Sequence, residues 1–231
     1  MKVILVASTA VYDSVMSAVG YETHNHRLES SADELAEFSG RNCYQSFNRP
    51  NPKTKTNESY LGHILDVGHE SVLEHASATF YIEASRSVLT ELERHRHLSF
   101  SVVSQRYVDP GQLGGHIPPS VAKLGDSIVK ELMLESSNKS LEAYDTIVEI
   151  LLSNGLARKQ AREAARAVLP NMTNSPMVVT GNHRAWRYVI KARWHEAADA
   201  EIRELASMLL EQLREIAPNT YQDIPDEPYS Y

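Results

Sequence analysis

A chain of 231 residues is long enough to bury a substantial core but short for two average domains, so we expect a single domain. The formal charge of -7 argues against a general nucleic-acid-binding surface, which is normally basic. Cys43 is the one cysteine, so an intrachain disulfide is excluded, and no apolar run approaches the roughly 18 residues of a membrane span. We therefore expect a cytoplasmic protein that binds neither membranes nor nucleic acids.

The first half of the chain predicts strands separated by helices. Residues 2–7 are apolar and rich in Val and Ile, which is typical of a buried strand. Residues 31–38 have an acidic start and apolar positions at helical spacing, and Gly40 is expected to end this helix. Residues 77–82 alternate apolar and polar side chains, which predicts a strand with one buried face.

The second half is predominantly helical. Apolar residues at helical spacing predict helices over 126–153, 157–168 and 196–217. Residues 101–108 and 177–180 are expected to form short strands. A few strands among predominant helices predict an α/β or mixed α+β fold with a small central mixed sheet.

The stretch 94–106 has an unusual charge pattern. It contains three arginines and two histidines without one carboxylate, although the chain as a whole is acidic. An anionic ligand would offset the repulsion among these cations, and planar guanidiniums match phosphate oxygens well. A helix capped by Ser85 would deliver Arg94 and Arg96 at its C-terminal turn, where the helix dipole stabilises a cation by about 0.3–1 kcal/mol. The pattern favours a local anion site, and a solvated basic loop is the other interpretation.

Two common ways of binding a nucleotide are missing from the sequence. No Gly-x-Gly-x-x-Gly follows the first strand, and there is no Gly-x-x-x-x-Gly-Lys-Ser/Thr. Arginine side chains are the obvious substitute, because each charge-assisted hydrogen bond contributes about 1.5–3 kcal/mol.

Two residues could serve as a nucleophile. Cys43 has only Arg41 as a basic neighbour, and a lone cysteine is most often a small buried hydrophobe. Ser104 has no evident general base, and hydroxyl groups near phosphates are more commonly hydrogen-bond donors. A third route leaves the difficult chemistry to a cofactor, while the protein positions and polarises the substrate.

Two further functions are compatible with parts of the pattern. A metal-dependent hydrolase could use His24, His26, His69, His75, His95 and His97. Zinc needs three or four convergent ligands, however, and neither a His-Glu-x-x-His motif nor a cysteine pair is present. An RNA-binding or interaction module could use the stretch 94–106, with Phe100 and Tyr107 stacking on bases, but the acidic net charge weighs against it.

Three segments together resemble one enzyme family. Arg94-His95-Arg96 is followed after seven residues by Ser104-x-Arg106, residues 69–75 read HESVLEH, and residues 181–187 read GNHRAWR. In order and spacing these segments resemble the flavin-dependent thymidylate synthases, over roughly residues 40–218.

The resemblance implies a mixed α/β fold that assembles as a homotetramer with active sites where subunits meet. It implies reductive methylation of dUMP to dTMP, with methylene-tetrahydrofolate supplying the carbon and NADPH-reduced FAD supplying the hydride. Neither a metal nor a covalent protein nucleophile is implied. The catalytic domain would cover residues 1–221, and the acidic, Pro-containing residues 222–231 are expected to form a flexible tail.

The resemblance also implies roles for individual residues. Arg193 is placed at the uracil ring and is the expected catalytic residue. The expected dUMP contacts are Glu91, Arg94, Val102, Ser104, Gln105, Arg106, Arg166 and Arg193. The expected FAD contacts are His69, Ser71, Arg94, His95, Arg96, Val102, Asn182, Arg184 and Tyr188.

Two positions depart from the family pattern, and some assignments have a purely structural interpretation. Val102 stands where many members have Glu or Gln, so only a backbone contact is expected there, and Tyr188 replaces a more usual His or Asn. Arg166 could be a solvated surface charge, Arg193 could stack on an aromatic ring, and His69 could be a histidine hydrogen-bonded to a carboxylate.

Overall fold

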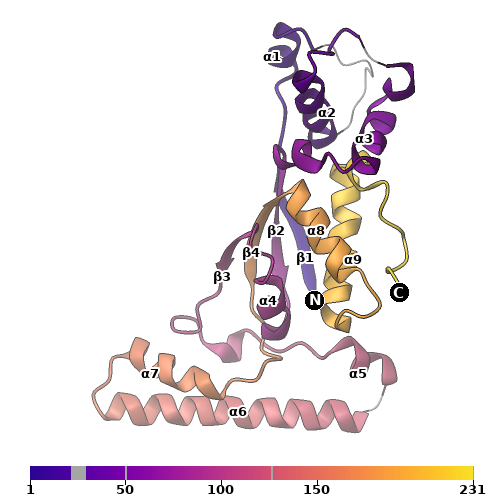
Figure 1. Ribbon diagram of the computed structural model, residues 1–231. Helices are drawn as coiled ribbons and strands as arrows, with labels where there is room; N and C mark the ends of the chain where they lie inside the picture. The colour runs from indigo at the N-terminus through magenta and orange to yellow at the C-terminus, as the bar shows by residue number, and fades with distance from the viewer. Residues whose placement is uncertain (22–29, 50, 126, 231) are drawn as a thin grey trace.

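The computed structural model describes residues 1–21, 30–49, 51–125 and 127–230, with a four-stranded sheet at the centre (Figure 1). The strands lie in the order β1-β2-β4-β3, and every neighbouring pair is antiparallel. Their bounds are β1 (Lys2–Ser8), β2 (Ser77–Glu83), β3 (Ser99–Val102) and β4 (Met177–Asn182).

The expectation of a mixed sheet is wrong, for a reason visible along β2. Ala78, Phe80 and Ile82 are buried, and the residues between them are half-exposed. Such alternation is typical of an antiparallel sheet with one covered face, whereas parallel strands are normally buried on both faces. The chain is thus a mixed α/β domain, mostly helical, with a small antiparallel sheet.

Three helices lie beside the covered face of the sheet: α4 (Arg86–Leu92), α8 (His183–Arg193) and α9 (Ala200–Ile216). Trp186 of α8 is fully buried, meets the ring of Phe80 edge-on at 5.2 Å and donates a hydrogen bond from Nε1 to the Ala78 carbonyl at 3.0 Å. This contact fixes α8 against β2, and an edge-to-face aromatic pair adds about 0.5–1.5 kcal/mol to the burial itself.

The helices α1 (Asp13–Ala18), α2 (Ser31–Cys43) and α3 (Asn57–Asp66) form one end of the molecule (Figure 1). The expectation that Gly40 ends a helix is wrong, because α2 continues through it to Cys43. A side chain at position 40 would overlap the hydroxyl of Tyr60 on α3. Gly40 therefore permits the close approach of two helices instead of terminating one.

The opposite end is built from α5 (Pro119–Leu124), α6 (Ser127–Ser153) and α7 (Arg158–Ala165). The helix expected over 126–153 is confirmed for its described residues; Asp126 lies outside them. Among the described residues of α6 only Tyr144 is buried. None of the helices in the described ranges is both long and apolar enough to cross a membrane.

Two expected elements begin or end elsewhere. The strand expected over 101–108 is β3, which ends at Val102, and a turn follows in which the Ser104 carbonyl accepts hydrogen bonds from the Tyr107 and Val108 amides. The last helix starts at Ala200 instead of residue 196, because the Asp199 side chain caps it by accepting from the Glu201 amide at 2.9 Å. Short 3-10 turns complete the chain at Pro52–Thr54 (η1), Glu70–Glu74 (η2), Pro110–Gln112 (η3), Arg166–Val168 (η4) and Asn219–Tyr221 (η5).

Residues 222–230, for which the sequence predicts a flexible tail, lie against α8. The Asp223 carboxylate accepts two hydrogen bonds from the buried Arg187 guanidinium, at 2.6 and 2.7 Å. Trp194 Nε1 donates to the Pro225 carbonyl at 3.1 Å, and the Glu196 amide donates to the Tyr229 carbonyl at 2.9 Å. A buried arginine needs a counter-ion, so one acidic residue of this segment is part of the folded domain.

Candidate active site

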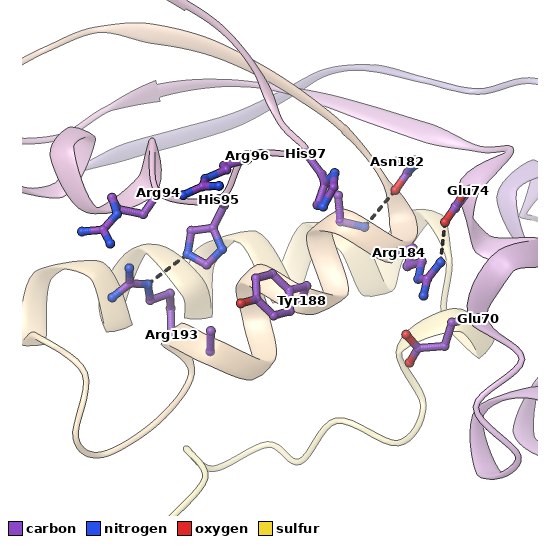
Figure 2. Close-up of a pocket in the computed structure, with 12 residues that line it drawn as sticks. Glu70, Glu74, Arg94, His95, Arg96, His97, Asn182, Arg184, Tyr188 and Arg193 are labelled. Atoms are coloured by element: carbon purple, nitrogen blue, oxygen red, sulfur yellow. Dashed lines mark hydrogen bonds and ion pairs between the residues drawn. The ribbon is translucent and has the colours of Figure 1, made fainter.

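A cavity of about 980 Å³ lies between the turn that follows α4, the outer face of α8 and η2 (Figure 2). Its walls carry four arginines, two histidines and two glutamates among apolar and amide side chains. The lining residues are Glu70, Glu74, Arg94, His95, Arg96, His97, Asn182, Arg184, Ala185, Tyr188, Ala192 and Arg193. This composition suits an anionic ligand with an aromatic part.

The position of Arg94, His95 and Arg96 follows from the way α4 begins and ends. The Ser85 side chain caps the helix by accepting from the Val88 amide at 3.2 Å, as the sequence predicts. Val88, Leu89 and Leu92 are buried in the core and fix the helix axis. The turn after Leu92 then exposes both arginines and buries His95 between them.

The opposite wall is one stripe of α8. Asn182 caps this helix, with its side-chain oxygen accepting from the Ala185 amide at 2.8 Å. Arg184 and Tyr188 are four residues apart and therefore share a helix face, and Figure 2 shows both side chains along the cavity. The residues Trp186, Val189 and Ile190 are buried in the core on the other side of α8. The amphipathic pattern of α8 thus turns its polar side chains toward the cavity.

Arg193 is held by three hydrogen-bond acceptors at the end of α4. Its Nη1 donates to the Glu91 carboxylate at 2.7 Å, and its Nη2 donates to the Glu91 carbonyl at 3.2 Å. Its Nε donates to Nε2 of His95 at 3.0 Å (Figure 2). The Arg193 side chain is 21% exposed and lines the cavity, so its guanidinium is fixed and the residue is still accessible from the cavity.

His95 is a neutral imidazole in this environment. Burial first, and the charge of Arg193 second, lower the pKa of His95 to about 4. Because Nε2 accepts the hydrogen bond from Arg193, the ring proton resides on Nδ1. Nδ1 is buried without a partner among the described residues, and the ring meets Tyr188 edge-on at 5.5 Å.

The remaining charges of the cavity differ in their pairing. Arg184 Nη1 lies 2.5 Å from the Glu74 carboxylate, and Glu70 lies 3.4 Å from Nζ of Lys191. Both glutamates are thus matched by cations of α8. Neither Arg94 nor Arg96 forms an ion pair or a side-chain hydrogen bond within the described part of the chain. Their charges remain available to a ligand.

The sequence-predicted residues fall into two groups. Seven of them line the cavity, namely Arg94, His95, Arg96, Asn182, Arg184, Tyr188 and Arg193. Glu91 accepts a hydrogen bond from Arg193 but is not part of the lining. His69 and Ser71 are exposed, one on each side of Glu70 in the sequence, and are not part of the lining either.

The second group lies away from the cavity on the same chain. Ser104, Gln105 and Arg106 occupy the turn after β3, and Arg166 begins η4 directly after α7. Arg162 of α7 holds this turn by donating to the Tyr107 carbonyl at 2.5 Å, and it lies 3.5 Å from Asp109. Arg106 itself is 3.6 Å from the Glu163 carboxylate.

One predicted side chain points elsewhere, and three titratable residues of the cavity lining had not been predicted as contacts. The Val102 side chain packs against the core, so only its backbone is free for a ligand. Glu70, Glu74 and His97 line the cavity although they were not predicted as contacts. All three lie within or directly beside the quoted motifs, so their position in the sequence was the available signal.

The histidine-based metal site finds no support in the described residues. These residues contain no group of three His, Cys, Asp or Glu side chains that could hold a metal ion. His24 and His26, which that interpretation also used, lie outside them.

Fold and cavity together define an enzyme-like site whose arginine side chains suit an anionic ligand. The family described as "Thymidylate synthase complementing protein" matches residues 26–219. A "Probable flavin-dependent thymidylate synthase" of Mycobacterium phage D29 is 70% identical over 234 residues, which cover 100% of this chain and 99% of that protein. The protein of the same name from Mycobacterium phage L5 is 66% identical over 243 residues, covering 100% of both chains.

A more distant relative is the "Flavin-dependent thymidylate synthase" of Corynebacterium aurimucosum, 46% identical over 227 residues that cover 95% of this chain and 89% of that protein. The chain therefore belongs to the flavin-dependent thymidylate synthase family. This confirms the resemblance noted in the sequence, and it sets aside both the RNA-binding module and the metal hydrolase.

Proposed function

We propose that this flavin-dependent thymidylate synthase converts dUMP to dTMP at the cavity between the α4 turn and α8, with FAD bound there and Arg193 beside the uracil ring. The observation that carries the proposal is that Arg94 and Arg96 face the cavity without an ion-pair partner among the described residues. FAD has a diphosphate, and two unpaired guanidiniums suit its charge and its oxygen geometry.

The cavity also fits the cofactor in size and chemistry. Its volume of about 980 Å³ is at the upper end of what small-molecule sites offer. We assign FAD contacts to His69, Ser71, Arg94, His95, Arg96, Asn182, Arg184 and Tyr188, and to the backbone of Val102. When bound and reduced by NADPH, FAD supplies the hydride of the reaction.

The task of Arg193 is electrostatic. Negative charge develops on the uracil ring as it is activated, and a fixed guanidinium beside the ring stabilises that charge by hydrogen bonding. One such donor contributes about 10²–10³ in rate. Methylene-tetrahydrofolate supplies the carbon in this proposal.

The dUMP phosphate requires the second group of residues. We assign it to Ser104, Gln105, Arg106 and Arg166, with Glu91 and Arg94 on the cavity side. Because these groups are apart on one chain, we propose that one subunit contributes the cavity and a neighbour contributes the turn after β3 and the start of η4. The assembly that we propose is the homotetramer implied by the family resemblance, with active sites between subunits.

Neither a cysteine nor a serine is among the described residues that line the cavity, which supports a route without a covalent cysteine or serine intermediate. Cys43 is exposed and Ser104 lies in the second group, and neither is part of the cavity lining. Cys43→Ser should therefore leave turnover unchanged. An exposed free thiol also fits the reducing cytoplasm, where we place the enzyme.

The absorption spectrum of the FAD-reconstituted protein under anaerobic conditions tests the proposal. NADPH should bleach the flavin bands, and the bands should recover only when dUMP and methylene-tetrahydrofolate are both present. Recovery with dUMP alone would contradict the assignment of FAD as electron donor for methyl formation. Failure to bind FAD at all would remove the cavity from the proposal.

A further inference from the structure

The strongest feature that the family pattern leaves unexplained is how Arg193 is held. All three of its acceptors come from Glu91, in the last turn of α4, and from His95, in the turn that follows the helix. Glu91 contributes a carboxylate oxygen and its main-chain carbonyl oxygen, and His95 contributes Nε2 of its imidazole. Arg193 is the last residue of α8, so its contacts connect the cavity wall formed by α8 with the wall formed by the turn after α4.

These contacts determine which N–H groups of Arg193 remain free. A guanidinium has five N–H donors in a fixed plane. His95 takes the one on Nε, and Glu91 takes one on each terminal nitrogen. One N–H on each terminal nitrogen is left, and both lie in the guanidinium plane that the three acceptors define.

The imidazole of His95 can accept this hydrogen bond only in one state. If His95 were protonated, Nε2 would carry a hydrogen and would repel the guanidinium. Burial keeps the ring neutral, since 93% of the residue surface is covered and the Tyr188 ring meets the imidazole edge-on. The required tautomer has its proton on Nδ1.

We propose that His95 and Glu91 are positioning residues that orient Arg193, so that its two remaining N–H groups face the substrate. The inference rests on the proposed role of Arg193 and adds to any contact that His95 makes with the flavin. A guanidinium held by three acceptors need not reorganise when charge develops on the ring, which is the condition under which a donor contributes most to catalysis.

Three substitutions of His95 separate positioning from flavin contact. His95→Gln places an amide oxygen near the former Nε2, His95→Asn places one near the former Nδ1, and His95→Phe keeps the ring shape without an acceptor. For each variant, kcat and the dUMP KM are measured at saturating FAD. The FAD dissociation constant is measured separately by fluorescence titration.

The asparagine and phenylalanine variants should lose about 10- to 100-fold in kcat, since a hydrogen bond to a charged group is removed. His95→Gln should recover most of that loss, because it restores an acceptor for Nε of Arg193. Equal losses for His95→Gln and His95→Asn would overturn the proposal. So would losses that disappear at saturating FAD, because they would identify His95 as a flavin contact alone.

A spectroscopic readout is independent of activity. In protein labelled with ¹⁵N-histidine, the resonances lost in His95→Gln should be those of a ring protonated on Nδ1 with an unprotonated Nε2. The opposite tautomer would contradict the hydrogen bond from Arg193.

Arg193→Ala separates this inference from the proposed function. If that variant turns over normally, Arg193 has no catalytic role and both proposals fail. If Arg193→Ala is inactive while His95→Gln and His95→Asn behave alike, only the positioning role of His95 is wrong.

Discussion

At the scale of single residues, the cavity arginines differ in their partners, and this difference separates their functions. Arg193 is fixed by three acceptors, and Arg184 is paired with Glu74. Arg94 and Arg96 have no such partner among the described residues. A fixed guanidinium suits a reacting ring, whereas an unbalanced charge contributes mainly to ligand affinity.

Arg96→Ala should therefore weaken FAD binding more than it disturbs the fold. Losing one charge-assisted contact to the diphosphate should raise the FAD dissociation constant by about 10- to 100-fold. Fluorescence titration with FAD measures this constant. Arg49→Ala is the matched control, since Arg49 is exposed and is not part of the cavity lining. Stoichiometric retention of FAD by Arg96→Ala would contradict the assignment.

The sequence predicted those active-site residues that are neighbours within one motif, but not the contacts between distant positions. Arg94 to Arg96 form one turn, so a motif is sufficient to place them together. The pairing of Arg193 with Glu91 joins positions 102 residues apart, and nothing in either local sequence specifies it. The burial of His95 between two exposed arginines likewise depends on the core contacts of α4.

His183 makes a prediction about stability and pH. It is fully buried, its Nδ1 lies 2.9 Å from the Tyr221 hydroxyl, and burial lowers the pKa of His183 to about 4. In the unfolded chain a histidine has a pKa of about 6.5. Between these two values the unfolded chain binds a proton that the folded chain does not. The stabilisation is therefore complete above about pH 6.5 and is lost as the pH falls toward 4.

The His183 contribution can be isolated with His183→Asn, which keeps a polar group near the former Nδ1. Glu34 has the opposite effect on the pH dependence of stability. Burial raises the pKa of Glu34 to about 6, so the folded chain gains stability from this group as the pH falls. The quantity to compare is thus the change in unfolding free energy between pH 7.5 and pH 5.0, by urea denaturation. The wild type should lose roughly 2 kcal/mol more than His183→Asn. His63→Asn, at an exposed histidine, is the control and should lose as much unfolding free energy as the wild type. An equal loss in the wild type and in His183→Asn would contradict a neutral, buried His183.

At the scale of helices and strands, periodicity predicted interiors better than ends. The spacing of apolar residues located α6 and α9, because both helices carry apolar side chains at helical intervals. The start of α9 was missed by four residues because Asp199 caps it, and α2 was ended too early at Gly40. A glycine in a helical pattern has two explanations, a C-terminal cap or a close contact, and only the partner helix decides between them.

Gly40→Ala tests the close contact between α2 and α3. A methyl group at position 40 would overlap the Tyr60 hydroxyl, so the substitution should destabilise the protein by about 1–3 kcal/mol. Urea denaturation measures the change. Gly62→Ala in α3 is the matched control: its methyl group would be 3.4 Å from the Gln222 side chain, an ordinary contact, and alanine is the better helix former.

The double variant with Tyr60→Phe identifies the cause. Removing the hydroxyl removes the atom nearest to the new methyl group, so Gly40→Ala should cost much less in the Tyr60→Phe background. If the two substitutions are simply additive, the close approach of Tyr60 does not explain why position 40 is glycine.

At the scale of the whole molecule, the sequence pattern did not predict contacts between segments that are far apart in the chain. β2 lies between β1 and β4, and its pairings connect residues about 70 to 100 positions apart. The contact of residues 222–230 with α8 depends on Arg187. This arginine is buried, and the Asp223 carboxylate accepts two of its hydrogen bonds. Neither feature has a local signal, because each arises from which surfaces the core brings together.

The long helix α6 carries the prediction that concerns assembly. Among its described residues only Tyr144 is buried, while Leu132 is 60% and Ile150 is 53% exposed. A helix with apolar side chains on a wide exposed surface is normally covered by a partner. In the proposed homotetramer a second copy of this chain covers α6, and the same contact brings the two groups of active-site residues together.

Leu132→Glu should therefore disrupt assembly and activity at the same time. The wild type should have four times the 25.9 kDa mass of one chain by light scattering, and Leu132→Glu should shift to smaller species, because a buried unpaired carboxylate is strongly unfavourable. Turnover should fall with the tetramer fraction and recover at higher protein concentration, whereas circular dichroism should stay unchanged. Asn138→Glu introduces the same charge at an exposed polar position of α6 and should remain tetrameric. A monomeric Leu132→Glu enzyme with full turnover would show that one chain suffices for the site, and the division of dUMP contacts between subunits would then be wrong.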